Sequence, residues 1–187
     1  MKKAVFLDRD GVINRAIVRN GKPYPPSSLS ELEILPGVAD ALNSLHKAKW
    51  LLIVVTNQPD VARGITRQAD VEAINQYLHK RLPIDEIFSC YHDRIDECNC
   101  RKPMPGALLS ASVAHNIDLQ LSYMVGDRWR DTEAGERAGC KTIFLDYGYK
   151  EKQPKNFNHR VRSLAEAVEI ILGKNEKNSR SQSSNIC

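Results

Sequence analysis

Short apolar runs alternate with segments of helical spacing along most of this chain, and this alternation limits its fold more than any other feature. Each run has the length of a buried strand. The predicted strands are Lys3 to Leu7, Leu51 to Val55, Glu86 to Cys90, Tyr123 to Val125 and Thr142 to Leu145. Because strands that alternate with crossover helices form a parallel sheet, we expect a doubly wound, Rossmann-like α/β fold.

The segments between the runs carry apolar residues on one side. One helix opens at Pro36 and Gly37, where Val38, Leu42 and Leu45 recur at close to the three- and four-residue spacing of a helix packed on one face. The other helices are predicted at Gln68 to Arg81, Gly106 to His115, Asp131 to Ala138 and Ser163 to Leu172. No insertion is long enough for a large cap domain, so we expect loops to cover the site.

Length and composition favour one folded domain over residues 1–172. A chain of 187 residues, 42% of them hydrophobic, can bury about 70% of its unfolded surface. The polar segment Asn14 to Leu35 contains three prolines and is predicted to be a loop at the mouth of the sheet. Residues 173–187 lack apolar periodicity and are predicted to form a disordered tail.

The composition argues against a membrane protein and against a nucleic-acid binder. The longest apolar stretch, Trp50 to Val55, is far shorter than the roughly 20 residues of a membrane helix. The first residues lack the apolar core of a secretory signal, so we expect a cytoplasmic chain. The net charge is +4, and the tail supplies +2 of it from Lys174, Lys177 and Arg180 against Glu176. The folded part is therefore nearly neutral, which favours a small-molecule substrate over nucleic acid or membrane.

Two aspartates follow the first predicted strand in the motif Asp8-Arg9-Asp10-Gly11. Alternate residues of an extended strand point to one side, so Asp8 and Asp10 are expected to converge while Arg9 points away. Two carboxylates this close need a compensating cation, and oxygen ligands suit magnesium. The alternative is a solvated turn before Gly11.

Other polar groups follow other strands. Thr56, Asn57 and Gln58 end the second strand and are neutral donors for phosphate, and Lys102 precedes a helix, where it can neutralise phosphate oxygens. A further carboxylate, Asp127, follows the fourth strand, with Asp131 one turn later. Ligands of such sheets bind outside the carboxyl ends of the strands, so these groups should face one crevice.

The ordered set D-x-D-G, T-N, a lysine before a helix, and G-D-x-x-x-D resembles the four motifs of the haloacid dehalogenase (HAD) superfamily phosphatases. The resemblance spans Val5 to Asp131. It implies that Asp8 is the nucleophile that forms an aspartyl phosphate, and that Asp10 protonates the leaving alcohol and then activates water.

The same resemblance implies the ligands of the metal and of the phosphate. Magnesium would lie between Asp8, the backbone carbonyl of Asp10, and Asp127. The phosphate-binding residues would be Thr56, Asn57, Gln58 and Lys102. Asp131 would orient the metal ligands or Lys102.

A cluster of soft ligands occupies a short segment of the chain: Cys90, His92, Cys98 and Cys100. Four ligands match the number that a structural zinc uses, and the alternative is a set of reduced surface thiols. The pattern C-x-H followed by C-x-C-R-K-P is similar to the HAD branch that holds heptose bisphosphate phosphatases and histidinol phosphate phosphatases. This resemblance implies a structural zinc and a small monomer.

The substrate is predicted from the arginines. The ending Ala62-Arg63-Gly64 is similar to the heptose bisphosphate group of this branch, which makes Arg63 a candidate substrate contact, and Arg101 and Arg128 could recognise a second phosphate. We therefore expect a magnesium-dependent phosphatase that removes the C7 phosphate of a heptose 1,7-bisphosphate during synthesis of nucleotide-activated heptose. The open alternatives are a histidinol phosphate phosphatase, a phosphatase of another small phosphate ester, and a non-catalytic zinc-stabilised interaction module.

Overall fold

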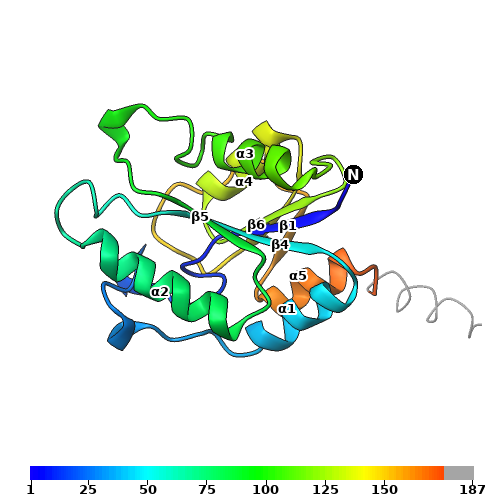
Figure 1. Cartoon of the computed structure of the whole chain (residues 1–187), viewed down its shortest axis with the longest axis horizontal. Coiled ribbons are helices and arrows are strands. Elements are labelled where there is room, and N and C mark those ends of the chain that lie inside the picture. The colour runs from blue at the N-terminus through cyan, green and yellow to red at the C-terminus, as the bar shows by residue number, and fades with distance from the viewer. Residues whose placement is uncertain (175–187) are drawn as a thin grey trace, which may run out of the picture.

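A parallel sheet of six strands forms the centre of the computed structural model, which describes residues 1–174. The strands lie in the order β5, β4, β1, β6, β7, β8 (Figure 1). Their bounds are Ala4–Leu7 for β1, Leu51–Asn57 for β4, Glu86–Cys90 for β5, Tyr123–Gly126 for β6, Lys141–Leu145 for β7 and His159–Val161 for β8. The predicted doubly wound α/β class is therefore confirmed.

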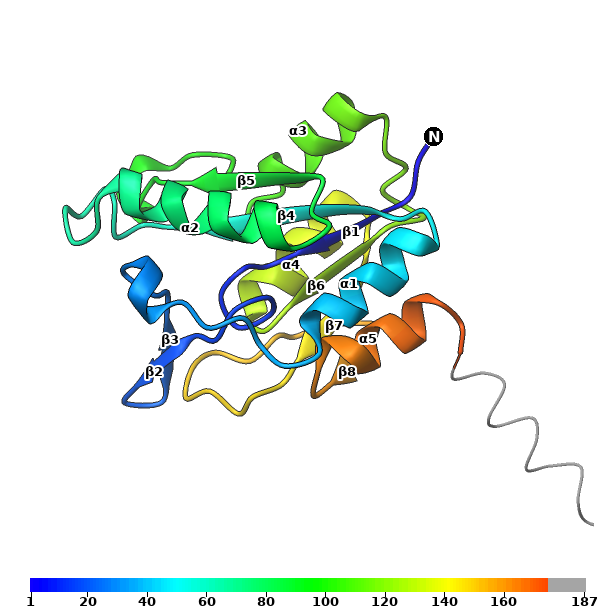
Figure 2. The same ribbon diagram turned by 60° about the horizontal axis from the view of Figure 1, so that its bottom comes forward.

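Helices cover both faces of the sheet (Figures 1 and 2). One face carries α1 (Val38–Lys47), α2 (Gln68–Arg81) and α5 (Leu164–Ile171), and the other carries α3 (Gly106–His115) and α4 (Trp129–Ala138). Alternation along β1 supplies both cores, because Val5 and Leu7 pack in the first cluster whereas Ala4 and Phe6 pack in the second. A strand buried on both faces reads as a continuous apolar run, which is why the sequence predicted it.

Three of the predicted boundaries move where the site begins. Strand β4 continues through Thr56 and Asn57, and β6 includes Gly126. Helix α4 begins at Trp129 because Asp131 caps it, its Oδ2 accepting the backbone N–H of Arg128 at 2.9 Å. Strand β8 was not predicted, since Val161 is its only apolar residue and its sequence shows no apolar run.

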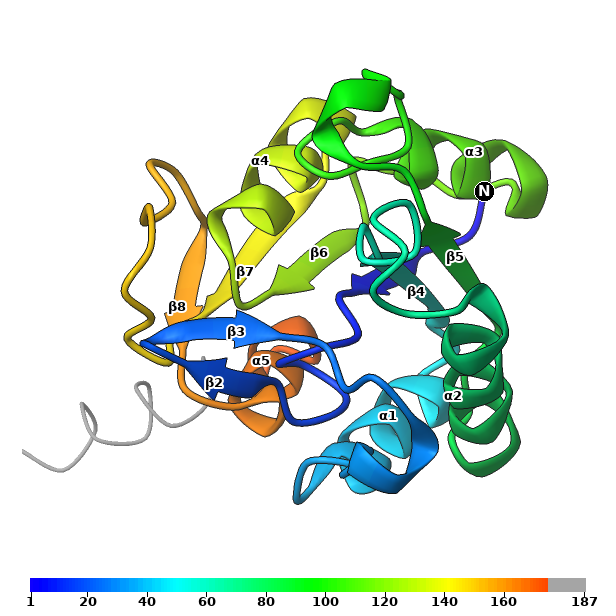
Figure 3. The same ribbon diagram turned by 90° about the vertical axis from the view of Figure 1, so that its left-hand side faces the viewer.

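The segment Asn14 to Leu35 is more ordered than the predicted loop. It contains a hairpin of β2 (Ile17–Arg19) and β3 (Lys22–Tyr24), followed by the short helix η1 (Leu29–Glu31). Figure 3 shows the hairpin beside the segment that follows β7, and the backbone N–H of Lys150 donates to the carbonyl of Gly21 at 2.8 Å. The hairpin reaches the site, because Pro23, Tyr24 and Pro25 line its cavity.

Two expectations from the composition concern membrane helices and the C-terminal tail. No helix within residues 1–174 combines the length and the apolar character that crossing a membrane requires. The disordered tail predicted at residues 173–187 lies almost entirely outside the described residues.

Candidate active site

The predicted site residues gather at the carboxyl ends of three neighbouring strands. Strand β1 lies between β4 and β6, and the chain moves outward in opposite directions from it. Asp8 follows β1, Asn57 ends β4, and Asp127 follows β6. This reversal of strand order is where open α/β sheets hold ligands.

Lys102 joins two of these strand ends. Its ammonium lies 2.9 Å from a carboxylate oxygen of Asp8 and 2.6 Å from one of Asp131, and it donates to the carbonyl of Val55 at 2.6 Å. The Asn57 side chain fixes the backbone of Lys102 with two hydrogen bonds of 3.0 Å. Burial alone would lower the pKa of Lys102, but Asp131 and Asp8 raise it above its usual value, so the lysine is a fixed positive charge.

Three buried carboxylates lie near the single positive charge of Lys102. Oxygens of Asp8, Asp127 and Asp131 lie within 4.8 Å of one another, and all three residues are buried. Both oxygens of Asp127 lack a hydrogen-bond partner among the described residues. Burial raises the pKa of Asp8 to about 7, although the charge of Lys102 opposes this shift. Burial and the neighbouring Asp8 also raise the pKa of Asp127. Unpartnered buried carboxylate oxygens of this kind fit a divalent cation with oxygen ligands.

Gly11 is required by the close approach of two strand ends. Its φ is +95°, and a Cβ built there would lie 1.8 Å from Oδ2 of Asp127. A larger residue would therefore push Asp127 away from Asp8, and the glycine in the D-x-D-G motif has a steric function.

The structure corrects the prediction that Arg9 points away from Asp10. The Arg9 side chain is fully buried, and its guanidinium donates to both carboxylate oxygens of Asp10 at 3.1 Å. Side chains do not alternate here because β1 ends at Leu7 and the next residues form a turn, in which the carbonyl of Arg9 accepts from the N–H of Ile13 at 2.9 Å. The only sequence signal for this contact is the position of Arg9 between two aspartates.

The residues expected to bind phosphate divide into two sets. Gln58 is buried and donates to Asp10 at 2.7 Å and to Thr56 at 2.8 Å, and Thr56 is itself fully buried. Asn57 and Lys102 instead line a small cavity of about 50 Å³ together with Asp8 and Asp10. We call this space the catalytic cavity.

A second cavity, of about 200 Å³, lies beside the catalytic cavity and shares Pro23, Tyr24, Pro25, Asn57, Arg128 and Arg130 with it. We call it the arginine cavity, because its lining includes Arg63, Arg101, Arg128 and Arg130. The structure therefore brings together the three arginines that the sequence singled out.

Each of those three arginines already has a partner. Arg63 contacts Asp93 at 2.7 Å and Asp60 at 3.0 Å, and Arg101 lies 3.8 Å from the same Asp93. Arg128 forms an ion pair with Glu151. The fourth arginine, Arg130, was not predicted from the sequence, where its only signal was its place between the two aspartates of the G-D-x-x-x-D motif.

The predicted zinc ligands converge on one point. The sulfurs of Cys90, Cys98 and Cys100 lie 3.3–3.7 Å apart, and Nδ1 of His92 lies 3.3 Å from the sulfur of Cys100. A zinc ion bound tetrahedrally, with Zn–S bonds of about 2.3 Å, would place its sulfurs a little under 4 Å apart. The four donor atoms therefore fit a closed tetrahedral site.

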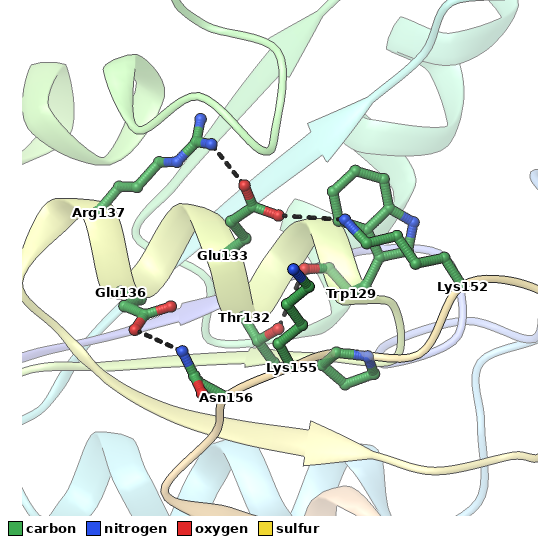
Figure 4. Close-up of a pocket in the computed structure, with 9 residues that line it drawn as sticks. Trp129, Thr132, Glu133, Glu136, Arg137, Lys152, Lys155 and Asn156 are labelled. Carbon is green, nitrogen blue, oxygen red and sulfur yellow. Dashed lines mark hydrogen bonds and ion pairs between the residues drawn. The ribbon is translucent and has the colours of Figure 1, made fainter.

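Trp129 lies outside the catalytic cavity. It lines a separate cavity of about 250 Å³ on the outer side of α4, with Glu133, Arg137 and Lys152 (Figure 4). The ammonium of Lys152 lies 3.6 Å from the centre of the indole ring. This residue therefore packs beside the site and takes no part in the catalytic cavity.

Comparison with known proteins places these features in a family. Residues 99–169 match the model of the HAD-hydrolase-like family. The D-glycero-beta-D-manno-heptose-1,7-bisphosphate 7-phosphatase of Escherichia coli K12 is 38% identical, over 90% of this chain and 93% of the relative. The enzyme of that name from Pasteurella multocida is 33% identical, over 92% of this chain and 98% of the relative.

A solved structure agrees with these relatives. The D,D-heptose 1,7-bisphosphate phosphatase of Bordetella bronchiseptica, crystallised with magnesium and phosphate, superposes with a TM-score of 0.80 at 32% identity. The match covers 92% of this chain and 99% of that protein.

Proposed function

The chain belongs to the HAD-like hydrolases, in the family of the heptose bisphosphate phosphatases, and from this membership we propose that it removes the C7 phosphate of D-glycero-β-D-manno-heptose 1,7-bisphosphate. It is a phosphoric monoester hydrolase. The observation that carries the proposal is the gathering of Asp8, Lys102, Asp127 and Asp131 at the strand ends of a chain this similar to those enzymes. The product is the heptose 1-phosphate used in making nucleotide-activated heptose.

In the first step the carboxylate of Asp8 attacks the phosphorus of the C7 phosphate. A bond forms between a carboxylate oxygen and phosphorus, and the bond from phosphorus to the sugar oxygen breaks. The sugar oxygen leaves with a proton from Asp10. Lys102, 2.9 Å from Asp8, supplies a fixed positive charge beside the transferring group.

In the second step Asp10, now a carboxylate, takes a proton from water. The water oxygen attacks phosphorus, and the aspartyl phosphate breaks to give inorganic phosphate and free Asp8. Asp10 is held for this task by Arg9, Asn14 and Gln58. Those donors fix the orientation of the Asp10 side chain.

Magnesium is the cofactor we propose for this site. The carboxylates of Asp8 and Asp127 and the backbone carbonyl of Asp10 would hold it, with Asp127 offering the two oxygens that no described residue satisfies. When bound, the ion neutralises the negative charge of the carboxylates and of the phosphate. Asp131 holds Lys102 in place, with a carboxylate oxygen 2.6 Å from the Lys102 ammonium.

Zinc is the second metal we propose, with a structural function. All four positions of the tetrahedron would be taken by Cys90, His92, Cys98 and Cys100, so no position remains for substrate. The last ligand is followed directly by Arg101 and Lys102. The metal would therefore fix the segment that delivers Lys102 to Asp8.

The second phosphate of the substrate is assigned to the arginine cavity. This cavity opens beside the catalytic cavity and carries an excess of positive charge from its arginines. A bisphosphate needs cations beyond one lysine and one metal ion, and arginine forms bidentate contacts with phosphate. Arg63, Arg101 and Arg128 remain our predicted contacts there.

Phosphate release tests the proposal. We would measure kcat/KM with magnesium for both anomers of heptose 1,7-bisphosphate, for fructose 1,6-bisphosphate and for histidinol phosphate. The proposal predicts a preference for the β-heptose substrate by at least about tenfold. A preference for histidinol phosphate would refute the substrate assignment, and a turnover of Asp8→Asn equal to that of the wild type would refute the nucleophile.

A further inference from the structure

Arg130 differs from the other arginines of the site in having no acidic partner in the part of the chain that the structure describes. Arg63, Arg101 and Arg128 each lie within 4 Å of an aspartate or glutamate. Within residues 1–174, no carboxylate forms an ion pair with Arg130, whose guanidinium instead lies 4.6 Å from the centre of the Trp129 ring. Its charge is therefore available to an anion from solution.

The position of Arg130 joins the two cavities. It lines the catalytic cavity with Asp8 and Lys102, and it lines the arginine cavity with Arg63 and Arg101. A group on this boundary can contact a ligand that extends from one cavity into the other. A bisphosphate is such a ligand, with one phosphate held at Lys102 and the second in the arginine cavity.

The surroundings of Arg130 also favour a bound anion. The side chain is partly buried, and burial and the neighbouring Arg128 lower its pKa. Holding a partly buried cation beside other cations costs free energy, which a bound anion recovers. The flat ring of Trp129 restricts the guanidinium, so less entropy is lost when it binds.

We propose that Arg130 binds the second phosphate group of the substrate and thereby selects bisphosphates over monophosphates. The inference rests on the proposed function, which supplies a substrate with two phosphates. Arg130 then makes the bidentate contact, and Arg63, Arg101 and Arg128, whose charges are shared with acidic partners, contribute weaker contacts to the same phosphate. Arg130 is a specificity residue and takes no part in the phosphoryl transfer.

The test compares two substrates that differ only in the second phosphate, heptose 1,7-bisphosphate and heptose 7-phosphate. Arg130→Met should lower kcat/KM for the bisphosphate about 10- to 100-fold, because the substrate loses a charge-assisted contact. The loss should appear as a higher KM. The loss in kcat/KM for the monophosphate should be clearly smaller, so that the preference for the bisphosphate falls. Arg130→Lys should fall between, because it keeps the charge and loses the bidentate geometry.

Arg67→Met is the matched control, since Arg67 is an exposed arginine paired with Asp70 and lines neither cavity. Equal losses on both substrates for Arg130→Met would overturn the inference, and so would an unchanged bisphosphate reaction. If the wild-type enzyme prefers a bisphosphate other than the heptose, the substrate proposal fails. The ratio of kcat/KM for that bisphosphate to kcat/KM for its monophosphate then still tests whether Arg130 binds the second phosphate. If no bisphosphate is preferred over its monophosphate, both proposals fail.

Discussion

Replacing Arg9 by methionine removes the buried cation that holds Asp10. The Arg9 side chain is fully buried, its guanidinium donates to both oxygens of Asp10 at 3.1 Å, and Nη1 donates to Asn75 at 2.9 Å. Methionine fills much of the same apolar volume, so the variant removes the donors without opening a large cavity.

The structure sets the size of the effect. Removing one partner of a fully buried ion pair costs about 3–5 kcal/mol. Asp10 keeps its donors Asn14 and Gln58, and its side chain is 13% exposed. We therefore expect the smaller loss of about 2–3 kcal/mol in the free energy of unfolding, close to the strength of hydrogen bonds to a charged group.

Urea denaturation of the metal-loaded protein measures this loss. With an m-value of about 2 kcal/mol/M, the midpoint of Arg9→Met should fall by roughly 1 M while m stays unchanged. Arg67→Met is the control, because the Arg67 side chain is 82% exposed and its pair with Asp70 should contribute less than about 1 kcal/mol.

The same variant should affect turnover. A misplaced Asp10 lowers kcat about 10- to 100-fold with little change in KM, because general acid–base catalysis supplies that part of the rate. The reasoning is refuted if Arg9→Met unfolds within about 0.5 kcal/mol of the wild type and keeps its kcat.

Three further perturbations test other parts of the structure. Gly11→Ala should lower kcat at least about 100-fold while the protein stays folded by circular dichroism, since its Cβ would lie 1.8 Å from Asp127; wild-type turnover would contradict the steric argument. Cys98→Ser should remove the zinc found by elemental analysis and lower Tm by about 4–8 °C, as a loss of about 2 kcal/mol does in a domain of this size; a parent protein without zinc would refute the site. Leu42→Ala, in the core under α1, should cost about 2–5 kcal/mol by urea denaturation with kcat unchanged; a loss under about 1 kcal/mol would contradict the packing described.

The sequence predicted most of the helices and strands because their apolar residues form a continuous run or recur at helical spacing. The apolar run of β4 and the spacing of Val38, Leu42 and Leu45 in α1 are examples. Strands β2, β3 and β8 were missed, since each has only three residues and one of them is charged, so none forms an apolar run.

The sequence predicted which polar residues lie close together but not the contacts that they make. The order of the motifs brought Asp8, Lys102 and Asp127 together, because strand ends meet at one edge of the sheet. The orientation of Arg9 depends on a turn that begins as β1 ends, and the free charge of Arg130 depends on which acids lie near each arginine. Such facts arise from tertiary packing, which spacing along a chain does not encode.

Chemical trapping of the phosphorylated enzyme tests the central claim most directly. The enzyme would be quenched during turnover of heptose 1,7-bisphosphate and treated with borohydride, which reduces an aspartyl phosphate to homoserine, and the modified residue would be located by peptide mass spectrometry. The account predicts modification at Asp8 and its absence in Asp8→Asn. Modification at Asp10, or rapid phosphate release with Asp8 unmodified, would contradict it.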